Sequence, residues 1–295
     1  MNAAASKNDW LRCTRRDEDE VTLGAAQRLA ATLDRDPAVL QRGDELPESW
    51  YAILFGPVAL QSALGRDGHP RTSDFLPPLA GTRRMFGGRR TRFIAPLKIG
   101  DAVSRVSTVT GATQKSGSTG PFTLVTVTHE ISGPSGLAVM EEQDIIYRAP
   151  VETGAATPQR SAAPPPYPPL QAGEGAEGEW SAAIELDSVI VFRYSALTFN
   201  AHRIHYDLPY AREVEGYPAL VMNGGLTALL LIETARPHLP RPIAGYAARA
   251  MSPLFVGQRV TFNGRLAGGT ARLWASSPDG GLAYQVDLTL ADAAR

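Results

Sequence analysis

"AMSPLFVGQRV", residues 250–260, repeats at the same spacing a phrase that already stands at residues 93–103, "FIAPLKIGDAV". Both place proline, leucine, glycine and valine in the same order, and each leads from one strand-like run into another. "GLAY" at 281–284 likewise echoes "GLAV" at 136–139. A Pro-Leu-x-x-Gly phrase alone could be a common strand–turn element, but the similar order of elements in both halves favours an internal duplication.

The two copies are separated by residues 151–180, a stretch rich in Pro, Ala and Gly that lacks apolar periodicity. Prolines at this density stiffen a chain toward an extended form, which suits a connector between domains. We therefore predict an N-terminal domain over 1–150, a linker over 151–180 and a C-terminal domain over 181–295.

Within the domains, four runs rich in β-branched and aromatic residues predict strands: 122–132, 138–147, 259–266 and 283–290. Residues 22–34 place apolar side chains on one helical face.

Residues 224–239 are apolar almost all round for two turns, which predicts a buried helix. Asn223 or Thr227 could cap this helix, and Pro237 should end or kink it. A buried helix followed by antiparallel strands, twice over, predicts an α+β fold in which a sheet wraps around a helix.

Composition limits the classes of function. The chain has 295 residues, of which 43% are apolar, so it can build one large domain or two ordinary ones. A net charge of -1 provides no global field for nucleic acid or a membrane surface. The single cysteine, Cys13, excludes an internal disulfide framework and fits a reducing cytoplasm. The most apolar run, 226–232, is too short to span a bilayer, so we expect a cytoplasmic protein.

The stretch "FNAHRIHYD", residues 199–207, holds two of the five histidines. A metal site built on His202, His205 and Asp207 is one alternative, but a His-x-x-His pair needs a further ligand from elsewhere. Nucleophilic catalysis by Ser195 is another, although the chain has no G-x-S-x-G motif.

General acid–base chemistry fits these residues better. A histidine with its ordinary pKa of about 6.5 can take a proton from water, which suggests His205. Asn200 cannot titrate but can hold a water by hydrogen bonds. Gly224 and Gly225 open the buried helix, where free N–H groups favour a developing negative charge such as a thioester enolate.

The stretch "FRYSALTFNAHRIHYDLPYAREVEGYPALV", residues 192–221, resembles the hydratase signature of the MaoC-like hotdog family. It is most similar to the branch that contains 3-methylfumaryl-CoA (mesaconyl-CoA) hydratases and fungal mitochondrial hydroxyacyl-thioester dehydratases. Residues 76–109 are similar to the FAS1-like dehydratase N-terminal domain of that branch. The resemblance implies a double hotdog and reversible hydration of a 2-enoyl thioester, with no metal and no cofactor besides the CoA or carrier thioester of the substrate.

The resemblance also implies roles for particular residues. The family's catalytic Asp and His, five apart, fall on Asn200 and His205, so His205 would carry protons while Asn200 orients the water. The family's His-Gly dipeptide falls on Asn223 and Gly224, which would make the Gly224 N–H the group that polarises the thioester carbonyl. Gly225 stands where the branch usually has proline.

Several candidates keep two interpretations. Arg203 would bind a distal carboxylate of the acyl group or remain solvated, and Tyr194, like Tyr217, would line the substrate site or belong to the core. Asp207 is expected to brace the loop. A set of arginines would bind the CoA phosphates or form a solvated basic turn: Arg83, Arg84, Arg89 and Arg90.

The sequence thus predicts an enoyl-thioester hydratase or dehydratase acting on a short acyl-CoA, branched and dicarboxylic chains included. A thioesterase that uses Glu233, and an acyl-thioester-binding protein without activity, are the alternatives. We expect a homodimer or larger homo-oligomer, with no nucleic-acid or membrane partner.

Overall fold

The computed structural model describes residues 10–71, 75–76, 83–117, 120–148 and 179–292. The chain divides into two compact units, Met1–Pro150 and Val151–Arg295. The predicted linker, 151–180, lies outside the described residues except for its last two, which begin a strand.

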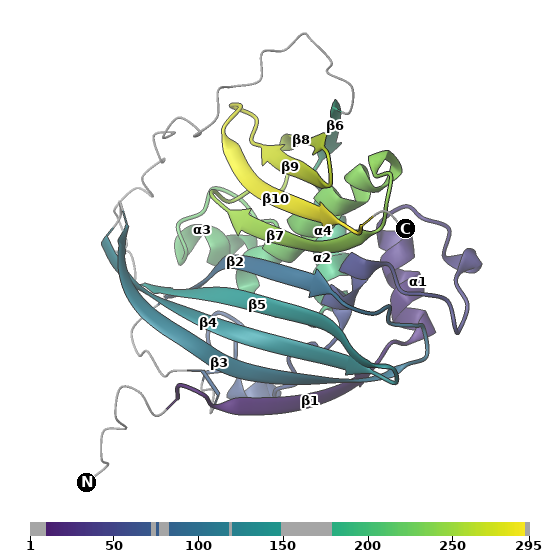
Figure 1. Cartoon of the computed structure of the whole chain (residues 1–295). Coiled ribbons are helices and arrows are strands. Elements are labelled where there is room, and N and C mark those ends of the chain that lie inside the picture. Colours follow the sequence, from purple (N-terminus) through teal and green to yellow (C-terminus); the bar gives the residue numbers. More distant parts are fainter. Residues whose placement is uncertain (1–9, 72–74, 77–82, 118–119, 149–178, 293–295) are drawn as a thin grey trace. The chain divides into compact units, whose positions relative to one another are not determined.

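In its described residues, the first unit is a curved antiparallel sheet accompanied by the α-helix α1 (Figure 1). The strands follow the order β1-β3-β4-β5-β2 across the sheet. Its elements along the chain are β1 (Thr14–Glu20), α1 (Leu23–Thr32), the 3-10 helices η1 (Pro37–Val39), η2 (Glu48–Ile53) and η3 (Gln61–Ala63), then β2 (Arg83–Phe93), β3 (Ala102–Gly117), β4 (Gly120–Gly133) and β5 (Gly136–Arg148).

The second unit has the same plan, with strands in the order β6-β8-β9-β10-β7. Its elements are β6 (Glu179–Glu185), α2 (Ser188–Leu197), η4 (Arg203–His205), α3 (Leu208–Glu213), α4 (Gly224–Ala235), η5 (Arg236–His238), β7 (Ile243–Ala250), β8 (Arg259–Ala267), β9 (Thr270–Ser276) and β10 (Leu282–Leu290). Strand for strand the two sheets correspond, so the predicted duplication is confirmed.

The repeated Pro-Leu-x-x-Gly phrases occupy equivalent turns. Gly100 and Gly257 have φ of +102° and +85°, a backbone region that favours glycine. The N–H of Gly100 donates to the Val21 carbonyl, and that of Gly257 to the Leu186 carbonyl, both at 2.7 Å. Each phrase therefore ties the end of the unit's first strand to the start of its third.

Helix α4 is the buried helix that the sequence predicts. Most of its side chains are buried, and it packs against β8, β9 and β10. It ends at Ala235, and Pro237 lies in the following 3-10 turn. The four predicted strands lie within β4, β5, β8 and β10, and the helix expected at 22–34 is α1.

The expectation of a buried helix in both halves needs a correction. In the first unit the Leu46 N–H donates to the Leu97 carbonyl. In the second unit the Met222 N–H donates to the Leu254 carbonyl in the same way, so the two units correspond at this point. In the second unit the 12-residue α4 follows, whereas in the first unit the 6-residue η2 follows. Within the described ranges, a helix as long as α4 occurs at this position in the second unit alone.

No helix within the described ranges is long and apolar enough to cross a membrane.

Candidate active site

The signature loop leaves α2 through a strained residue. Phe199 has φ of +51°, an uncommon backbone region for a bulky side chain. The N–H of Asn200 then donates to the Ser195 carbonyl at 2.8 Å. The Asn200 Oδ1 accepts from the His202 N–H at 3.0 Å, so this side chain shapes the loop that carries the histidines.

The backbone fixes the tautomer of the neutral His205 ring. The residue is 7% exposed, and its Nδ1 lies 2.8 Å from the carbonyl oxygen of Val221. A carbonyl oxygen only accepts hydrogen bonds, so Nδ1 must carry the hydrogen. In the neutral ring the lone pair is therefore on Nε2, which makes Nε2 the atom that can take a proton.

The neighbours of His205 fix the loop. The His202 ring meets the His205 ring edge to face, with centroids 5.4 Å apart. Asp207 caps α3 by accepting the Tyr210 N–H at 3.0 Å, which confirms that Asp207 braces the loop. The hydrogen bonds from the Tyr210 N–H and the Arg203 guanidinium hold the pKa of Asp207 below its usual value.

Arg203 is engaged within the same loop. Its guanidinium donates to Asp207 at 2.6 and 3.0 Å and lies 4.1 Å from the centre of the Tyr210 ring. A distal carboxylate of an acyl group would have to share this guanidinium with Asp207. Tyr217 packs with Phe255 beside the buried cluster that contains Tyr210, as expected of a core aromatic.

The N-terminus of α4 offers hydrogen-bond donors. The first bond within the helix runs from the Thr227 N–H to the Asn223 carbonyl, at 3.0 Å. Helical geometry leaves the preceding N–H groups, those of Gly224, Gly225 and Leu226, without an acceptor inside the helix. Because these groups carry the positive end of the helix dipole, they suit an oxygen that gains negative charge.

Tyr194 shows why residue 225 is a glycine. A Cβ added to Gly225 would lie 2.5 Å from the Tyr194 hydroxyl oxygen, closer than real Cβ atoms come. Tyr194 is 5% exposed, so its hydroxyl has little room to move away. The hydroxyl thus lies against the second residue of α4.

Asn223, immediately before α4, is tied to α2. The residue is 3% exposed, and its Nδ2 donates to the Ser195 Oγ at 3.1 Å. The Ser195 hydroxyl therefore accepts a hydrogen bond from this amide. The two residues are 28 positions apart, and the sequence alone contained no signal for this contact.

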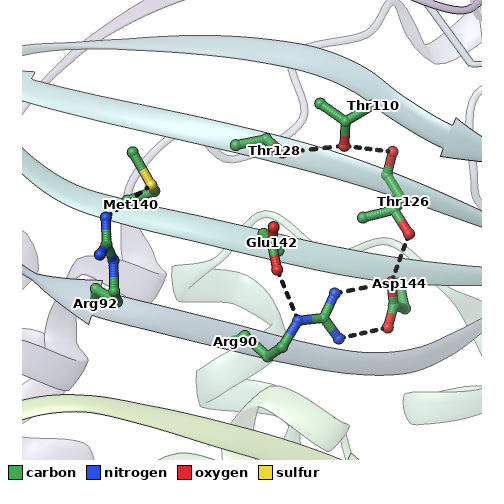
Figure 2. Close-up of polar contacts among 8 residues, drawn as sticks. All are labelled: Arg90, Arg92, Thr110, Thr126, Thr128, Met140, Glu142 and Asp144. Carbon is green, nitrogen blue, oxygen red and sulfur yellow. Dashed lines mark hydrogen bonds and ion pairs between the residues drawn. The ribbon is translucent and has the colours of Figure 1, made fainter.

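Arg89 and Arg90, in the basic stretch 82–90, pair with different carboxylates on β5. The Arg90 guanidinium donates to Glu142 at 2.7 Å and to Asp144 at 2.8 and 3.2 Å, and Figure 2 shows these three residues together. Burial raises the pKa of Asp144, but hydrogen bonds from Arg90 and Thr126 outweigh this and lower it overall. Arg84 is exposed, and the side chain of Arg83 lies outside the described part of the chain. Arg90 is thus already paired with two carboxylates.

Arg89 points to the opposite face of β2 from Arg90, because successive residues of a strand alternate between its two faces. It pairs with Glu141 at 3.2 Å. Glu141 also accepts a short hydrogen bond from the Tyr51 hydroxyl, which lies 2.9 Å from the Thr91 hydroxyl. This network anchors η2 to the sheet, and sequence reasoning missed it.

His129 lies next to that network, opposite Glu141 across the β4–β5 ladder. Its Nδ1 is 2.8 Å from the Ser107 hydroxyl oxygen. Burial lowers the pKa of His129 to about 4, despite the opposing effect of Glu141. The native ring is therefore neutral at pH 7.

Comparison with known proteins gives a consistent family. Residues 50–256 match the family model of hydroxyacyl-thioester dehydratase type 2. The mesaconyl-C(4)-CoA hydratase of Chloroflexus aurantiacus is 41% identical over 281 residues, which cover 95% of this chain and 96% of that protein.

Solved structures support the fold. A MaoC-like dehydratase matches with a TM-score of 0.69 at 15% identity, covering 97% of this chain and 99% of that one. A Mycobacterium tuberculosis protein described as having a double hotdog fold matches with a TM-score of 0.57 at 13% identity, covering 95% and 96%. The predicted α+β double hotdog is thereby confirmed.

Proposed function

This chain belongs to the hydroxyacyl-thioester dehydratase type 2 family and is a hydro-lyase of acyl-CoA thioesters, and from that premise we propose that it adds water to a short 2-enoyl-CoA by means of His205. The substrate we propose is mesaconyl-C(4)-CoA, the branched dicarboxylic thioester that the 41% identical relative is named for. The observation that carries the mechanism is the 2.8 Å bond from the His205 Nδ1–H to the Val221 carbonyl.

The proposed reaction begins with water held at the His205 Nε2. As the water oxygen attacks C3 of the enoyl group, Nε2 takes one of its protons and the C2=C3 electrons move toward the thioester oxygen. The Gly224 N–H stabilises the resulting enolate. The Val221 carbonyl accepts from Nδ1 throughout, which favours the imidazolium. Nε2 then returns the proton to C2, so one water has been added and the enzyme is unchanged.

The remaining residues have supporting roles in this proposal. Asn200 orients the water through its loop, and Tyr194 with Gly225 shapes the space in front of α4. Arg203 contributes to the distal end of the acyl group while it stays paired with Asp207. Arg84, which is exposed, is the arginine we favour for a CoA phosphate, because Arg89 and Arg90 are already paired with carboxylates.

Localisation, assembly and cofactor use extend the proposal. We place the protein in the reducing cytoplasm as a homodimer or larger assembly, and the reaction written above needs no cofactor. Size-exclusion chromatography with light scattering tests the assembly.

The thioesterase alternative has less support. Glu233 pairs with Arg236 at 3.3 Å near the C-terminal end of α4. It lies nine positions after Gly224, which is about 13 Å along the helix axis. A carboxylate there is far from the N–H groups that would polarise a thioester carbonyl.

A panel assay tests the proposed function. Purified protein is offered mesaconyl-C(4)-CoA, itaconyl-CoA and crotonyl-CoA, and loss of the enoyl absorbance is followed together with release of free thiol. We expect hydration, fastest with mesaconyl-C(4)-CoA, and its loss in His205→Ala with the fold retained. Thiol release without hydration would favour the thioesterase, and neither reaction would favour a binding protein.

A further inference from the structure

The Asn223 side chain contains a buried acceptor without a partner. The residue is 3% exposed, and within the described ranges its Oδ1 has no hydrogen-bond partner, although its Nδ2 is bonded to Ser195. Asn223 occupies the cap position of α4 but makes no side-chain cap bond to that helix. A buried acceptor left unsatisfied is costly and calls for a donor.

The position of this acceptor relates it to the proposed reaction. Val221, which fixes the His205 ring, is two residues before Asn223 in the same extended segment, and Gly224 is one residue after it. In the sequence, Asn223 therefore lies between the residue that fixes the His205 ring and the residue whose N–H stabilises the enolate in the proposed reaction. Ser195 holds the amide by Nδ2, which leaves Oδ1 as the amide atom without a partner among the described residues.

The chemistry of the ligand indicates which donor would meet Oδ1. The thioester carbonyl and any distal carboxylate of the acyl group are acceptors and cannot satisfy it. The water that adds to C3 is a donor, and so is the hydroxyl group that this water becomes. After one of its protons passes to His205, the other remains on the oxygen and can stay bonded to Oδ1.

We propose that Asn223 binds the attacking water, and in the reverse direction the 3-hydroxyl of the hydroxyacyl thioester, through its Oδ1, with Ser195 as the residue that positions the amide. The inference rests on the proposed function and assigns the hydroxyl-binding subsite of the same site. It makes Asn223 a residue that distinguishes hydroxylated from non-hydroxylated acyl chains.

A binding comparison in a protein that cannot turn the ligand over tests this proposal. In the His205→Ala background, calorimetry measures the Kd of 3-hydroxy-3-methylsuccinyl-CoA and of 3-methylsuccinyl-CoA, which differ by one hydroxyl. We expect the hydroxylated ligand to bind about 3- to 10-fold more tightly, as one net hydrogen bond provides. Adding Asn223→Leu should abolish the difference, while Asn263→Leu, the same change on β8, should leave it intact.

Ser195→Ala provides a second variant should Asn223→Leu fail to fold. It should reduce the preference for the hydroxylated ligand, and it should have no further effect when Asn223 is already leucine. The proposal would be overturned if the preference for the hydroxylated ligand persisted in both variants. It would also be overturned if both ligands lost affinity equally, because that would indicate that Asn223 binds the pantetheine amides that both ligands share. If the wild-type protein hydrates the enoyl-CoA but one of these two results is found, the role of Asn223 is refuted and the proposed function stands. If the wild-type protein does not hydrate the enoyl-CoA and neither ligand binds, both the role of Asn223 and the proposed function are overturned.

Discussion

Replacing Gly225 with alanine should expose a direct conflict with the Tyr194 hydroxyl. The new Cβ would lie 2.5 Å from that oxygen and 3.4 Å from the ring carbon bearing it. Overpacking of this kind costs about 1–3 kcal/mol, while exchanging glycine for alanine in a helix gains up to about 1 kcal/mol. We therefore expect Gly225→Ala to lower the free energy of unfolding by up to about 2 kcal/mol.

The Tyr194→Phe background should remove that penalty. Without the hydroxyl, the nearest remaining contact of the new Cβ is at 3.4 Å, an ordinary distance. Alanine at 225 should then be neutral or stabilising by up to about 1 kcal/mol. Urea unfolding of the four proteins in this double-mutant cycle should give a coupling energy of about 1–3 kcal/mol.

Gly24 provides the matched control, because it is the second residue of α1 as Gly225 is of α4. A Cβ there would be 3.4 Å from the end of the flexible Arg28 side chain. Gly24→Ala should be neutral or stabilising and additive with Tyr194→Phe. If Gly225→Ala cost the same free energy with and without the Tyr194 hydroxyl, the steric reasoning would be refuted.

Four further predictions concern other parts of the chain. Burial lowers the pKa of His129 from 6.5 to about 4, so the neutral ring's contribution to stability is lost as the pH falls below 6.5, by about 2 kcal/mol at pH 5. Urea unfolding should show that the free energy of unfolding falls less between pH 7.5 and pH 5 in His129→Gln than in the wild type. An equal fall in the two proteins would contradict this prediction. Asp207→Ala should lower the hydration kcat about tenfold by loosening the His205 loop, and Asp207→Asn, which can still accept the Tyr210 N–H, should lower it less; steady-state kinetics showing no difference between the two would oppose the capping role. Glu233→Gln should leave the hydration rate unchanged within about twofold, as expected for a group about 13 Å from Gly224, whereas an acid essential for the reaction would abolish it. Arg84→Ala should raise the KM for CoA thioesters about 2- to 5-fold, as for one exposed ion pair, without affecting a pantetheine thioester that lacks the nucleotide phosphates.

The parts of the fold that the sequence predicted are those with a clear period or a single dominant residue type. The strands within β4 and β10 alternate or are rich in β-branched residues, and α4 is apolar on all sides. Gly100 and Gly257 marked equivalent turns, and this led to the duplication.

The elements that were missed lack such a signal. β1 has the sequence "TRRDEDE", mostly exposed, and its place is fixed by pairing with β3. The β-branched and aromatic residues of α2 are typical of a strand, yet Asp187 caps it as a helix through the Ile190 N–H, and Tyr194 and Ser195 are buried. Tertiary packing there outweighs local propensity.

The site was predicted only as far as local sequence reaches. The loop histidines and the glycines of α4 lie in recognisable stretches, so His205, Gly224 and Asp207 could be assigned roles. The Val221 carbonyl that fixes the His205 ring and the Ser195 hydroxyl that holds Asn223 are contacts across 16 and 28 residues. Such contacts follow from the fold and have no spacing rule in the sequence.

The stereochemistry of water addition in D₂O tests the central claim most directly, namely that His205 alone both takes and returns the proton. NMR of the product formed from the best enoyl-CoA substrate shows on which face of the former double bond the deuteron at C2 and the oxygen at C3 lie. One ring nitrogen acting on one face requires syn addition, with a single deuteron at C2. Anti addition would contradict this mechanism, because it would require a second proton donor on the opposite face.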